Sequence, residues 1–454
     1  MKECSTKQLS ECIKPGRLIT DWETEKNIIP FFDNSVRNVR RFIYKKPRDP
    51  LIYIDKCQHV EYSIDKNKDY TKLTNVKSIN INWPDNLGTK WVYAKCMDNQ
   101  RSGQPEFNHL IYPTIINKQL KEDNPNVVVL QVDGMSHRQY QSLYKETQAV
   151  LKSLKSKLET FSFKNYWANG YNSPPNQKRM FCDDKSCDSS HVLKHFQQAG
   201  FETSWINEYT YGLMGYPLDN SGSRYVDKLF AGNYYNKYWR SELSEMDGGY
   251  AWDEYCYEKT LRYLDLFVRD NGSQKNTQTG SHAAIVIPNV AHSSERMRAK
   301  QMDKTLAKLL REWDRDGIMS NTIFCVVADH GIHASPINIF FAGEFEHRNP
   351  VFEMIVPKSF LQKHSNVETY LKHNTNAIIT HFDIYKSIAS LANVQTWNLS
   401  NKKATEQKKY NIFMDTIPVT RTCQQAGIPD EWCNCWEWKS ELHHAFGTLQ
   451  QMYW

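Results

Sequence analysis

The alternation of short apolar runs with helical stretches is the feature that most constrains the fold of this chain. Residues 127–132, 283–288 and 322–327 are nearly all apolar and rich in β-branched residues, as expected of strands covered on both faces. Stretches of helical periodicity alternate with them, at 142–161, 191–201, 253–270, 298–317 and 382–393. Two further runs, 202–209 and 351–357, are strand-like. This order predicts an α/β fold with a mostly parallel sheet and helices on both faces.

The same pattern divides the chain into three parts. Residues 1–123 are irregular, with short strand-like runs at 51–54 and 91–94. The regular alternation occupies 124–395, which we expect to be the α/β catalytic domain, and 396–454 form a cysteine-containing C-terminal extension. A chain of 454 residues is long enough for one large domain with appendages or for two domains.

Composition excludes several classes of protein. The chain is 40% hydrophobic and 24% charged, which is ordinary for a globular protein with a sizeable core. Its net charge of +6 comes from 57 basic and 51 acidic side chains without a basic stripe interleaved with aromatics, so we expect no nucleic-acid partner. No run approaches the ~20 apolar residues of a transmembrane helix, so we expect no membrane span.

The eleven cysteines favour disulfides over a zinc finger. Cys433 and Cys435 are too close for the usual zinc-binding pair, and with Cys423 they lack a fourth partner. Disulfides indicate an extracellular or secretory-lumen location, where the acceptor triplets at Asn271 and Asn398 would make the chain a glycoprotein. The opening residues show no signal-peptide apolar segment, so either the signal is missing from this sequence or the protein is not secreted.

Side chains that bind metals follow each of the three apolar strands. Asp133 follows the first strand, Asn289 and His292 follow the second, and Asp329 and His330 follow the third. The carboxyl ends of parallel strands meet at one edge of a sheet, where ligands bind. A single Asp after a strand is more often a helix N-cap, but three such strand ends together predict one or two divalent cations, above all zinc.

A hydrolytic metal site also needs a nucleophile, and two serines qualify. Ser173 lies in the proline-rigid segment 172–176, and coordination to a metal would hold its hydroxyl as the alkoxide. Ser136 is the rival, three residues beyond Asp133. Its more common role is to bond the local backbone as a helix begins, so Ser173 is preferred.

The order of these residues resembles the alkaline phosphatase superfamily, with its sulfatases, nucleotide pyrophosphatases and phosphodiesterases. Within it, the chain is most similar to a sulfatase-like family known as domain of unknown function 229. The resemblance covers roughly residues 124 to 395, and the tail is similar to that family's ending. The motifs that carry it are Asp133-Gly134, 172–176, Asn289-x-x-His292, Asp329-His330-Gly331 and, in the tail, Gly427–Pro429, Cys433 and Cys435.

The resemblance implies an alkaline phosphatase/sulfatase-like fold and a role for each residue. Ser173 would be the nucleophile, with Asp329 and His330 as ligands of the metal that activates it. Asp133 would be shared with or near a second metal, and His292 would be a ligand of that second metal. The implied reaction is hydrolysis or transfer of a phosphate, phosphodiester or, with least support, sulfate ester through a covalent enzyme ester. The substrate would be a small molecule, a glycan or a lipid.

Departures from the family pattern leave alternatives open. Asn289 stands where many members have Asp, which weakens one metal site, and the last histidine of that site is open among His333, His347 and His381. Arg348 suits a bidentate contact to a phosphate or sulfate oxygen. The Cys-x-Pro-x-Arg core of sulfatases is missing from the sequence, which counts against a conventional sulfatase. A binding protein that keeps the fold without turnover is therefore a second hypothesis.

Overall fold

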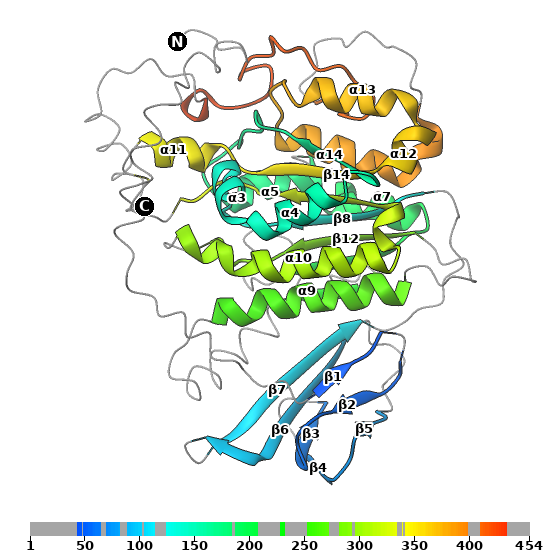
Figure 1. The fold of residues 1–454 in the computed structure, drawn as a ribbon. Helices are drawn as coiled ribbons and strands as arrows, with labels where there is room; N and C mark the ends of the chain where they lie inside the picture. Colours follow the sequence, from blue (N-terminus) through cyan, green and yellow to red (C-terminus); the bar gives the residue numbers. More distant parts are fainter. Residues whose placement is uncertain are drawn as a thin grey trace.

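The computed structural model is built around one seven-stranded sheet (Figure 1). It describes residues 43–47, 49–64, 70–81, 89–101, 104–113, 124–183, 187–207, 228–231, 252–271, 281–292, 296–333, 338, 341–397 and 409–433. The strands, in their order across this sheet, are β11 (Lys228–Ala231), β10 (Glu202–Asn207), β12 (His282–Ile287), β8 (Asn126–Gln131), β13 (Thr322–Val327), β14 (Phe352–Pro357) and β9 (Leu158–Ser162).

The sheet is mostly parallel, as the sequence predicts. Neighbouring strands from β11 to β13 run parallel, whereas β14 and β9 are antiparallel to their neighbours. Every residue of β12 and β13 is buried. Alternate side chains of β8 enter two separate cores, with Val127 and Val129 in one and Val128 and Leu130 in the other. Strands covered on both faces explain the nearly continuous apolar runs.

Helices form a layer on each face of the sheet (Figure 1). The core that contains Val129 is covered by α5 (Ser173–Cys182), α7 (Val192–Gln198), α13 (Ser365–Asn374) and α14 (His381–Ser390). The core that contains Val128 is covered by α3 (His137–Leu143), α4 (Lys145–Ser153), α9 (Trp252–Asn271) and α10 (Gln301–Arg315). The remaining helices are α6 (Cys187–Ser190), α11 (Phe341–Arg348), α12 (Lys358–Lys363) and the 3-10 turns η2 (Arg296–Lys300), η3 (Ile318–Asn321), η5 (Leu391–Thr396) and η6 (Asp430–Trp432). These layers confirm the predicted fold class.

One expected helix is wrong in its second half. The sequence predicts a single helix over 142–161, but α4 ends at Ser153 and the end of that stretch is strand β9. The backbone of β9 pairs with β14 in an antiparallel register that places Thr160 opposite Ile355. Phe161 is buried in the core on the face of α5. Strand pairing and burial thus outweigh the helical periodicity of the sequence.

Two small antiparallel sheets form from the described part of the first 123 residues. They are β1 (Ile43–Lys45), β2 (Ile52–Ile54) and β5 (Ser78–Ile79), and β4 (Thr71–Thr74), β3 (His59–Ser63), β6 (Thr89–Arg101) and β7 (Gln104–Pro113). Leu266 of α9 is buried with the core of these sheets, so the N-terminal region packs on that helix (Figure 1). The strand-like runs at 51–54 and 91–94 fall in β2 and β6. The three-part division of the chain stays a prediction.

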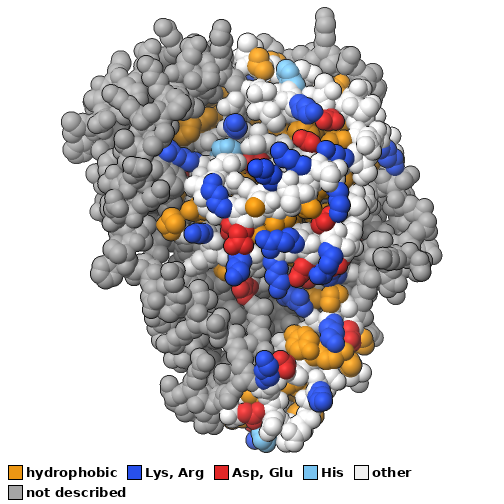
Figure 2. All heavy atoms as spheres, viewed as in Figure 1, with side chains coloured by type: hydrophobic (Ala, Val, Ile, Leu, Met, Phe, Trp, Pro, Cys, Tyr) orange, Lys and Arg blue, Asp and Glu red, His pale blue; other side chains and the backbone are white. Residues whose placement is uncertain are grey.

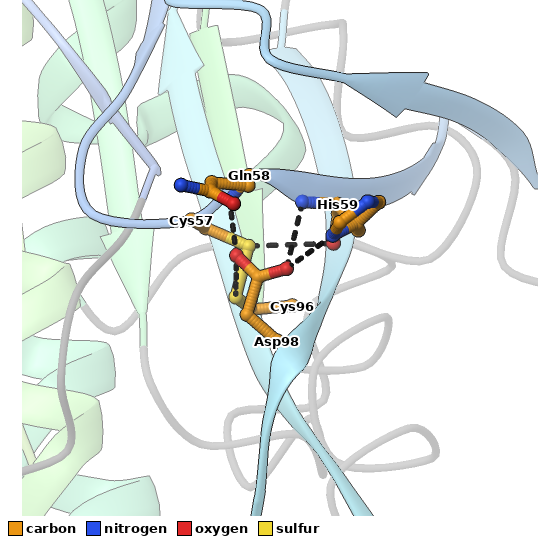
Figure 3. The surroundings of a disulfide bond; sticks show 5 residues. All are labelled: Cys57, Gln58, His59, Cys96 and Asp98. Atoms are coloured by element: carbon orange, nitrogen blue, oxygen red, sulfur yellow. Dashed lines mark hydrogen bonds and ion pairs between the residues drawn. A yellow bond between two sulfur atoms is a disulfide. The ribbon is translucent and has the colours of Figure 1, made fainter.

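Three disulfides are present in the described chain, which bears out the preference for disulfides over a zinc finger. They join Cys57 to Cys96, Cys182 to Cys187 and Cys423 to Cys433. Beside the first, Asp98 accepts hydrogen bonds from the backbone N–H groups of Gln58 and His59 (Figure 3). Cys435, Asn398 and the two residues after Asn271 in its acceptor triplet lie outside the described residues.

The surface carries charges of both signs. Figure 2 shows Lys and Arg side chains interspersed with Asp and Glu over the described part of one face. Such a mixture is typical of a solvated surface. Within the described residues, no helix combines the length and apolar character needed to cross a bilayer.

The segment 409–433 is packed into the α/β domain by a buried ion pair. Arg421 Nη1 lies 2.7 Å from Asp383 Oδ2, and both side chains are almost fully buried. Asp383 also accepts hydrogen bonds from the backbone N–H groups of Thr380 and Tyr410, each at 2.8 Å. One carboxylate therefore caps α14 and fastens the C-terminal segment to it.

Removal of Arg421 should be strongly destabilising. We expect Arg421→Ala to lower the free energy of unfolding by about 3–5 kcal/mol, because Asp383 is left buried without its cation. Urea unfolding measures the loss. The control is Lys372→Ala, which breaks an exposed ion pair with Glu368 and should leave the midpoint unchanged. Equal midpoints for Arg421→Ala and wild type would contradict a stabilising role for the buried pair.

Glu353 of β14 is a buried carboxyl that makes stability depend on pH. Its side chain accepts hydrogen bonds from Ser162 Oγ at 2.7 Å and Gln141 Nε2 at 3.0 Å. Burial raises its pKa from 4.5 to about 7. Because the folded-state pKa is raised, this stabilising contribution is fully present below pH ~4.5 and is lost as the pH rises through about 7.

Glu353→Gln should remove this pH dependence. The amide can accept the same hydrogen bonds without a charge, so the variant should match wild type near pH 4.5 and exceed it by about 3 kcal/mol above pH 7. Urea unfolding at several pH values measures the difference. Glu159→Gln, at a partly exposed position of β9, is the matched control and should follow wild type. A constant offset between wild type and Glu353→Gln at all pH values would refute the assignment.

Candidate active site

The loops that follow β8 and β13 bring three predicted ligands together. Asp133 follows β8, whereas Asp329 and His330 follow β13, and these two strands are neighbours in the sheet. One potential ligand atom from each of the three side chains lies within 4.8 Å of the others. All three side chains are buried. The carboxyl edge of the sheet thus holds two carboxylates and one imidazole at metal-binding distances.

Ser173 lies directly beside this group. It is the first residue of α5, after Asn172 in an extended conformation and before two prolines whose fixed φ suits a first helical turn. Ser173 Oγ is 3.2 Å from Asp133 Oδ1 and 3.1 Å from His330 Nε2. The hydroxyl is thus held at the positive end of the helix dipole, although Pro174 and Pro175 supply no backbone N–H groups there.

Ser136, the rival nucleophile, has a structural role. Its Oγ accepts a hydrogen bond from the backbone N–H of Gln139 at 2.9 Å, and this bond is half of a capping box at the start of α3. The same hydroxyl lies 2.8 Å from Glu346 Oε2, to which it donates. The hydroxyl thus accepts one hydrogen bond within α3 and donates another to α11.

Nε2 of His330 faces the two carboxyl groups and the Ser173 hydroxyl. Its Nδ1 lies 2.7 Å from the carbonyl oxygen of Gly331, which can only accept a hydrogen bond. Nδ1 therefore carries a proton, and in the neutral ring Nε2 can accept a hydrogen bond or bind a metal. Nε2 is 3.7 Å from both Asp133 Oδ1 and Asp329 Oδ2.

The pKa values of the two carboxyl groups, Asp133 and Asp329, are shifted in opposite directions. Burial raises the pKa of Asp133 well above its ordinary value, and the nearby Asp329 raises it further. Burial acts on Asp329 in the same direction, but His330 and the backbone N–H of Gly134 hold its pKa below the ordinary value. Ionising both of these adjacent buried carboxyls is therefore unfavourable unless a cation lies between them.

A second group of possible ligands consists of His330, His333 and His347, whose ligand atoms lie within 4.8 Å of one another. His347 Nε2 lies 2.7 Å from the carbonyl oxygen of Tyr171 and donates to it, which leaves Nδ1 with the lone pair. The ring centroid of His292 is 4.9 Å from that of His333. Burial lowers the pKa of His292 and His347, and that of His333 to about 3, so these rings are neutral, as metal ligands must be.

Two other predicted residues are placed differently. The carbonyl oxygen of Asn289 accepts a hydrogen bond from the backbone N–H of His292 at 3.0 Å. In the described part of the chain, Asn289 belongs to neither His/Cys/Asp/Glu group, since an amide is outside that set. Arg348 Nη2 lies 3.4 Å from Glu344 Oε2, and its guanidinium lies 5.1 Å from the ring centroid of Trp432.

Sequence reasoning missed several residues beside the site. Gln177 Nε2 donates to Asp329 Oδ2 at 3.0 Å, and its position one turn after Ser173 on α5 was a usable signal. His381 was only one of three open choices. Its Nδ1 lies 3.0 Å from Asn169 Oδ1, and burial lowers its pKa to about 3. Tyr171 and Trp432 gave no signal in the sequence.

Gly331 lets α11 approach the Asp-His pair. A Cβ at this position would lie 1.8 Å from the carbonyl oxygen of Glu346. The backbone N–H of Gly331 also donates to the carbonyl oxygen of His347 at 2.8 Å. The glycine thus permits the close contact that brings His347 to the site.

Gly331→Ala should displace α11. We expect a loss of at least about 3 kcal/mol in the free energy of unfolding, because rigid backbone stands where the methyl group would be. Gly200→Ala is the control. Gly200 has a φ of +92° but nothing within 4 Å, so its cost should stay near 1–2 kcal/mol. Chemical denaturation compares the two, and equal losses would contradict the importance of this close approach.

Comparisons with known proteins agree with the predicted resemblance. Residues 253–451 match the family model described as "Protein of unknown function (DUF229)". This match confirms the predicted resemblance, and it contains His292, Asp329 and His330, whereas Asp133 and Ser173 precede it. No curated protein matches the chain.

Three solved structures are similar to parts of this chain. An alkaline phosphatase superfamily protein from Vibrio parahaemolyticus is 14% identical, with 53% of this chain and 61% of that chain covered and a TM-score of 0.37. The periplasmic domain of Escherichia coli EptC with Zn is 14% identical, with 70% and 100% covered and a TM-score of 0.40. The soluble domain of lipooligosaccharide phosphoethanolamine transferase A from Neisseria meningitidis is 13% identical, with 61% and 90% covered and a TM-score of 0.38. The chemistry of the site rests on the residues of this chain.

Proposed function

We propose that this chain, which matches the DUF229 family over residues 253–451, is a metal-dependent hydrolase or transferase of phosphate or phosphodiester esters with Ser173 as its nucleophile. One observation carries the proposal. The Ser173 hydroxyl lies within 3.3 Å of the buried carboxyl of Asp133 and of Nε2 of His330. Any buried hydroxyl needs hydrogen-bond partners, but these two partners are also groups that would bind an activating cation.

The donor set fits a divalent cation. Asp133, Asp329 and His330 offer two oxygens and one nitrogen, the ligand set of a catalytic zinc site that keeps one position open. Because the two buried carboxyls are adjacent, a cation would relieve the cost of ionising both. His330 has one available nitrogen and can serve one cation, so His333 and His347, with His292 beside them, would serve a second.

The residues of the chain divide the chemistry among them. When bound, the cation would lower the pKa of the Ser173 hydroxyl so that it can act as a nucleophile. Ser173 Oγ forms a bond to phosphorus while the bond from phosphorus to the leaving oxygen breaks. Water then attacks phosphorus and the bond from Ser173 Oγ to phosphorus breaks, which releases phosphate from a monoester substrate or a phosphate monoester from a diester. In a transferase an alcohol takes the place of water.

The proposed substrate is defined by its reacting group, an esterified phosphate. A phosphate or phosphodiester on a small molecule, a glycan or a lipid fits the site, and a sulfate ester is the weaker candidate because the formylglycine core is missing. The disulfides support an extracellular or luminal location, and glycosylation at Asn271 and Asn398 would be consistent with it. Arg348 as a direct ligand of the substrate is less well supported, since it lies against Glu344.

The second candidate is a binding protein without turnover. The observation in its favour is Asn289, a neutral residue where many family members have an acidic ligand. Loss of one charge would weaken the second metal position and leave the first in place. Metal content and hydrolysis distinguish the two candidates.

Metal analysis and a matched pair of serine variants test the proposal. We expect purified protein to hold zinc, and chelation to lower the melting temperature, since a ligand bound only by the folded state stabilises it. On a panel of aryl phosphate, phosphodiester and sulfate ester, Ser173→Ala should reduce kcat/KM at least about a thousandfold. Ser136→Ala should retain hydrolysis, because it removes a helix cap.

Three outcomes contradict the proposal. A zinc content near zero, together with an unchanged melting temperature on chelation, would contradict the proposed metal site. Metal without hydrolysis of any ester on the panel would favour the binding protein. Full activity of Ser173→Ala with loss in Ser136→Ala would transfer the nucleophile to Ser136.

A further inference from the structure

Aromatic side chains lie one layer outside the metal-binding residues. Tyr171, two residues before Ser173, has its ring centroid 4.9 Å from that of His347 and 5.6 Å from that of Trp432. The His347 ring is itself 5.6 Å from the His330 ring. Ser173 and His330 are buried, whereas Tyr171 and Trp432 are partly exposed. We call the rings of Tyr171 and Trp432 the aromatic rim.

The C-terminal segment holds the aromatic rim in place. Trp432 ends the turn η6, and the disulfide between Cys423 and Cys433 fixes the residue that follows it. Trp432 packs against a buried cluster that contains Trp167 and Ile428. A ring fixed by a disulfide loses little conformational entropy when a ligand binds, so more of its contact energy contributes to affinity.

Negative side chains outnumber positive ones around Arg348 at this rim. The Arg348 guanidinium lies over the Trp432 ring at 5.1 Å and is paired with Glu344. Burial lowers the pKa of Arg348, and both Glu344 and Glu431 oppose that shift as nearby negative charges. Two carboxylates around one guanidinium give no attraction for a second anionic group. The rim therefore suits a neutral partner that offers a flat apolar face.

We propose that the aromatic rim is a subsite for the part of the substrate that does not react, and that this part is an uncharged ring, either a sugar or an aryl group. The inference rests on the proposed function, because it places the esterified phosphate at Ser173. The Tyr171 ring lies 4.9 Å from the His347 ring, which lies 5.6 Å from the ring of His330 beside Ser173, so a ring attached to that phosphate can reach the rim. The planes of Tyr171 and Trp432 are 65° apart, so a ring could stack on one of them and meet the other edge-on. These contacts would select esters of cyclic alcohols over short alkyl esters.

Binding of phosphonates to the zinc-loaded wild-type protein tests this subsite. Phosphonates lack the ester bond that would be hydrolysed, so calorimetry can compare methylphosphonate, phenylphosphonate and a neutral glycosyl phosphonate. We expect at least one ring compound to bind about tenfold more tightly than methylphosphonate, which is the effect of a good aromatic contact. The phenyl and glycosyl arms distinguish the two sources of the ring.

Variants of the rim assign the preference to its residues. Trp432→Ala should remove the preference for ring compounds, whereas Trp432→Phe, which keeps a ring, should retain most of it. Tyr171→Leu gives an independent test if Trp432→Ala does not fold, as judged by circular dichroism. A preference that survives in the folded Trp432→Ala or Tyr171→Leu protein would overturn the role of that ring.

The wild-type result separates this inference from the proposed function. Equal affinity for methyl and ring phosphonates, with zinc bound, would overturn the subsite and leave the phosphate-binding site intact. Failure to bind zinc or any phosphonate would overturn the proposed function, and the subsite with it. Tighter binding of an anionic ring than of its neutral counterpart would overturn the charge argument.

Discussion

The parallel pairing of β8 with β13 is the constraint on which the site depends. Gln131 lies opposite Val327 in this register, and the backbone N–H of Val132 donates to the carbonyl oxygen of Val327 at 2.8 Å. Both strands therefore end at the same level, and Asp133 and Asp329 emerge beside each other. A shift of register by one residue would turn one of these strands over and send its apolar residues to the wrong core. Packing of the two cores thus fixes the distance between the carboxylates.

Burial of two adjacent carboxylates is unfavourable in free energy, and neighbouring groups offset this to different extents at Asp133 and Asp329. Asp329 accepts hydrogen bonds from Gly134 and Gln177, and His330 stands next to both acids. Asp133 has fewer such partners, and its pKa is raised accordingly. Ser173 is the remaining polar neighbour of Asp133. The least compensated carboxyl thus lies against the serine, where a cation would stabilise both.

The sequence predicts the sheet and the residues at its carboxyl edge because both follow from local patterns. Buried strands are continuous apolar runs, and Asp133, Asp329 and His330 directly follow them. The remainder depends on long-range packing. β9 is a strand only because β14 lies beside it, and the contribution of His347 depends on the approach of α11 to Gly331.

The described C-terminal segment, residues 409–433, packs against the α/β domain beside the candidate site. The Arg421–Asp383 pair anchors it to α14 at the helix end where His381 lies. The Asn169 amide links that end to the loop before Ser173, because it bonds His381 Nδ1 and the carbonyl oxygen of Gly427. From this anchor the disulfide loop carries Trp432 to His347 and Tyr171. The described residues 409–433 therefore contact the α/β domain close to the candidate site, and the predicted boundary at residue 395 stays a prediction.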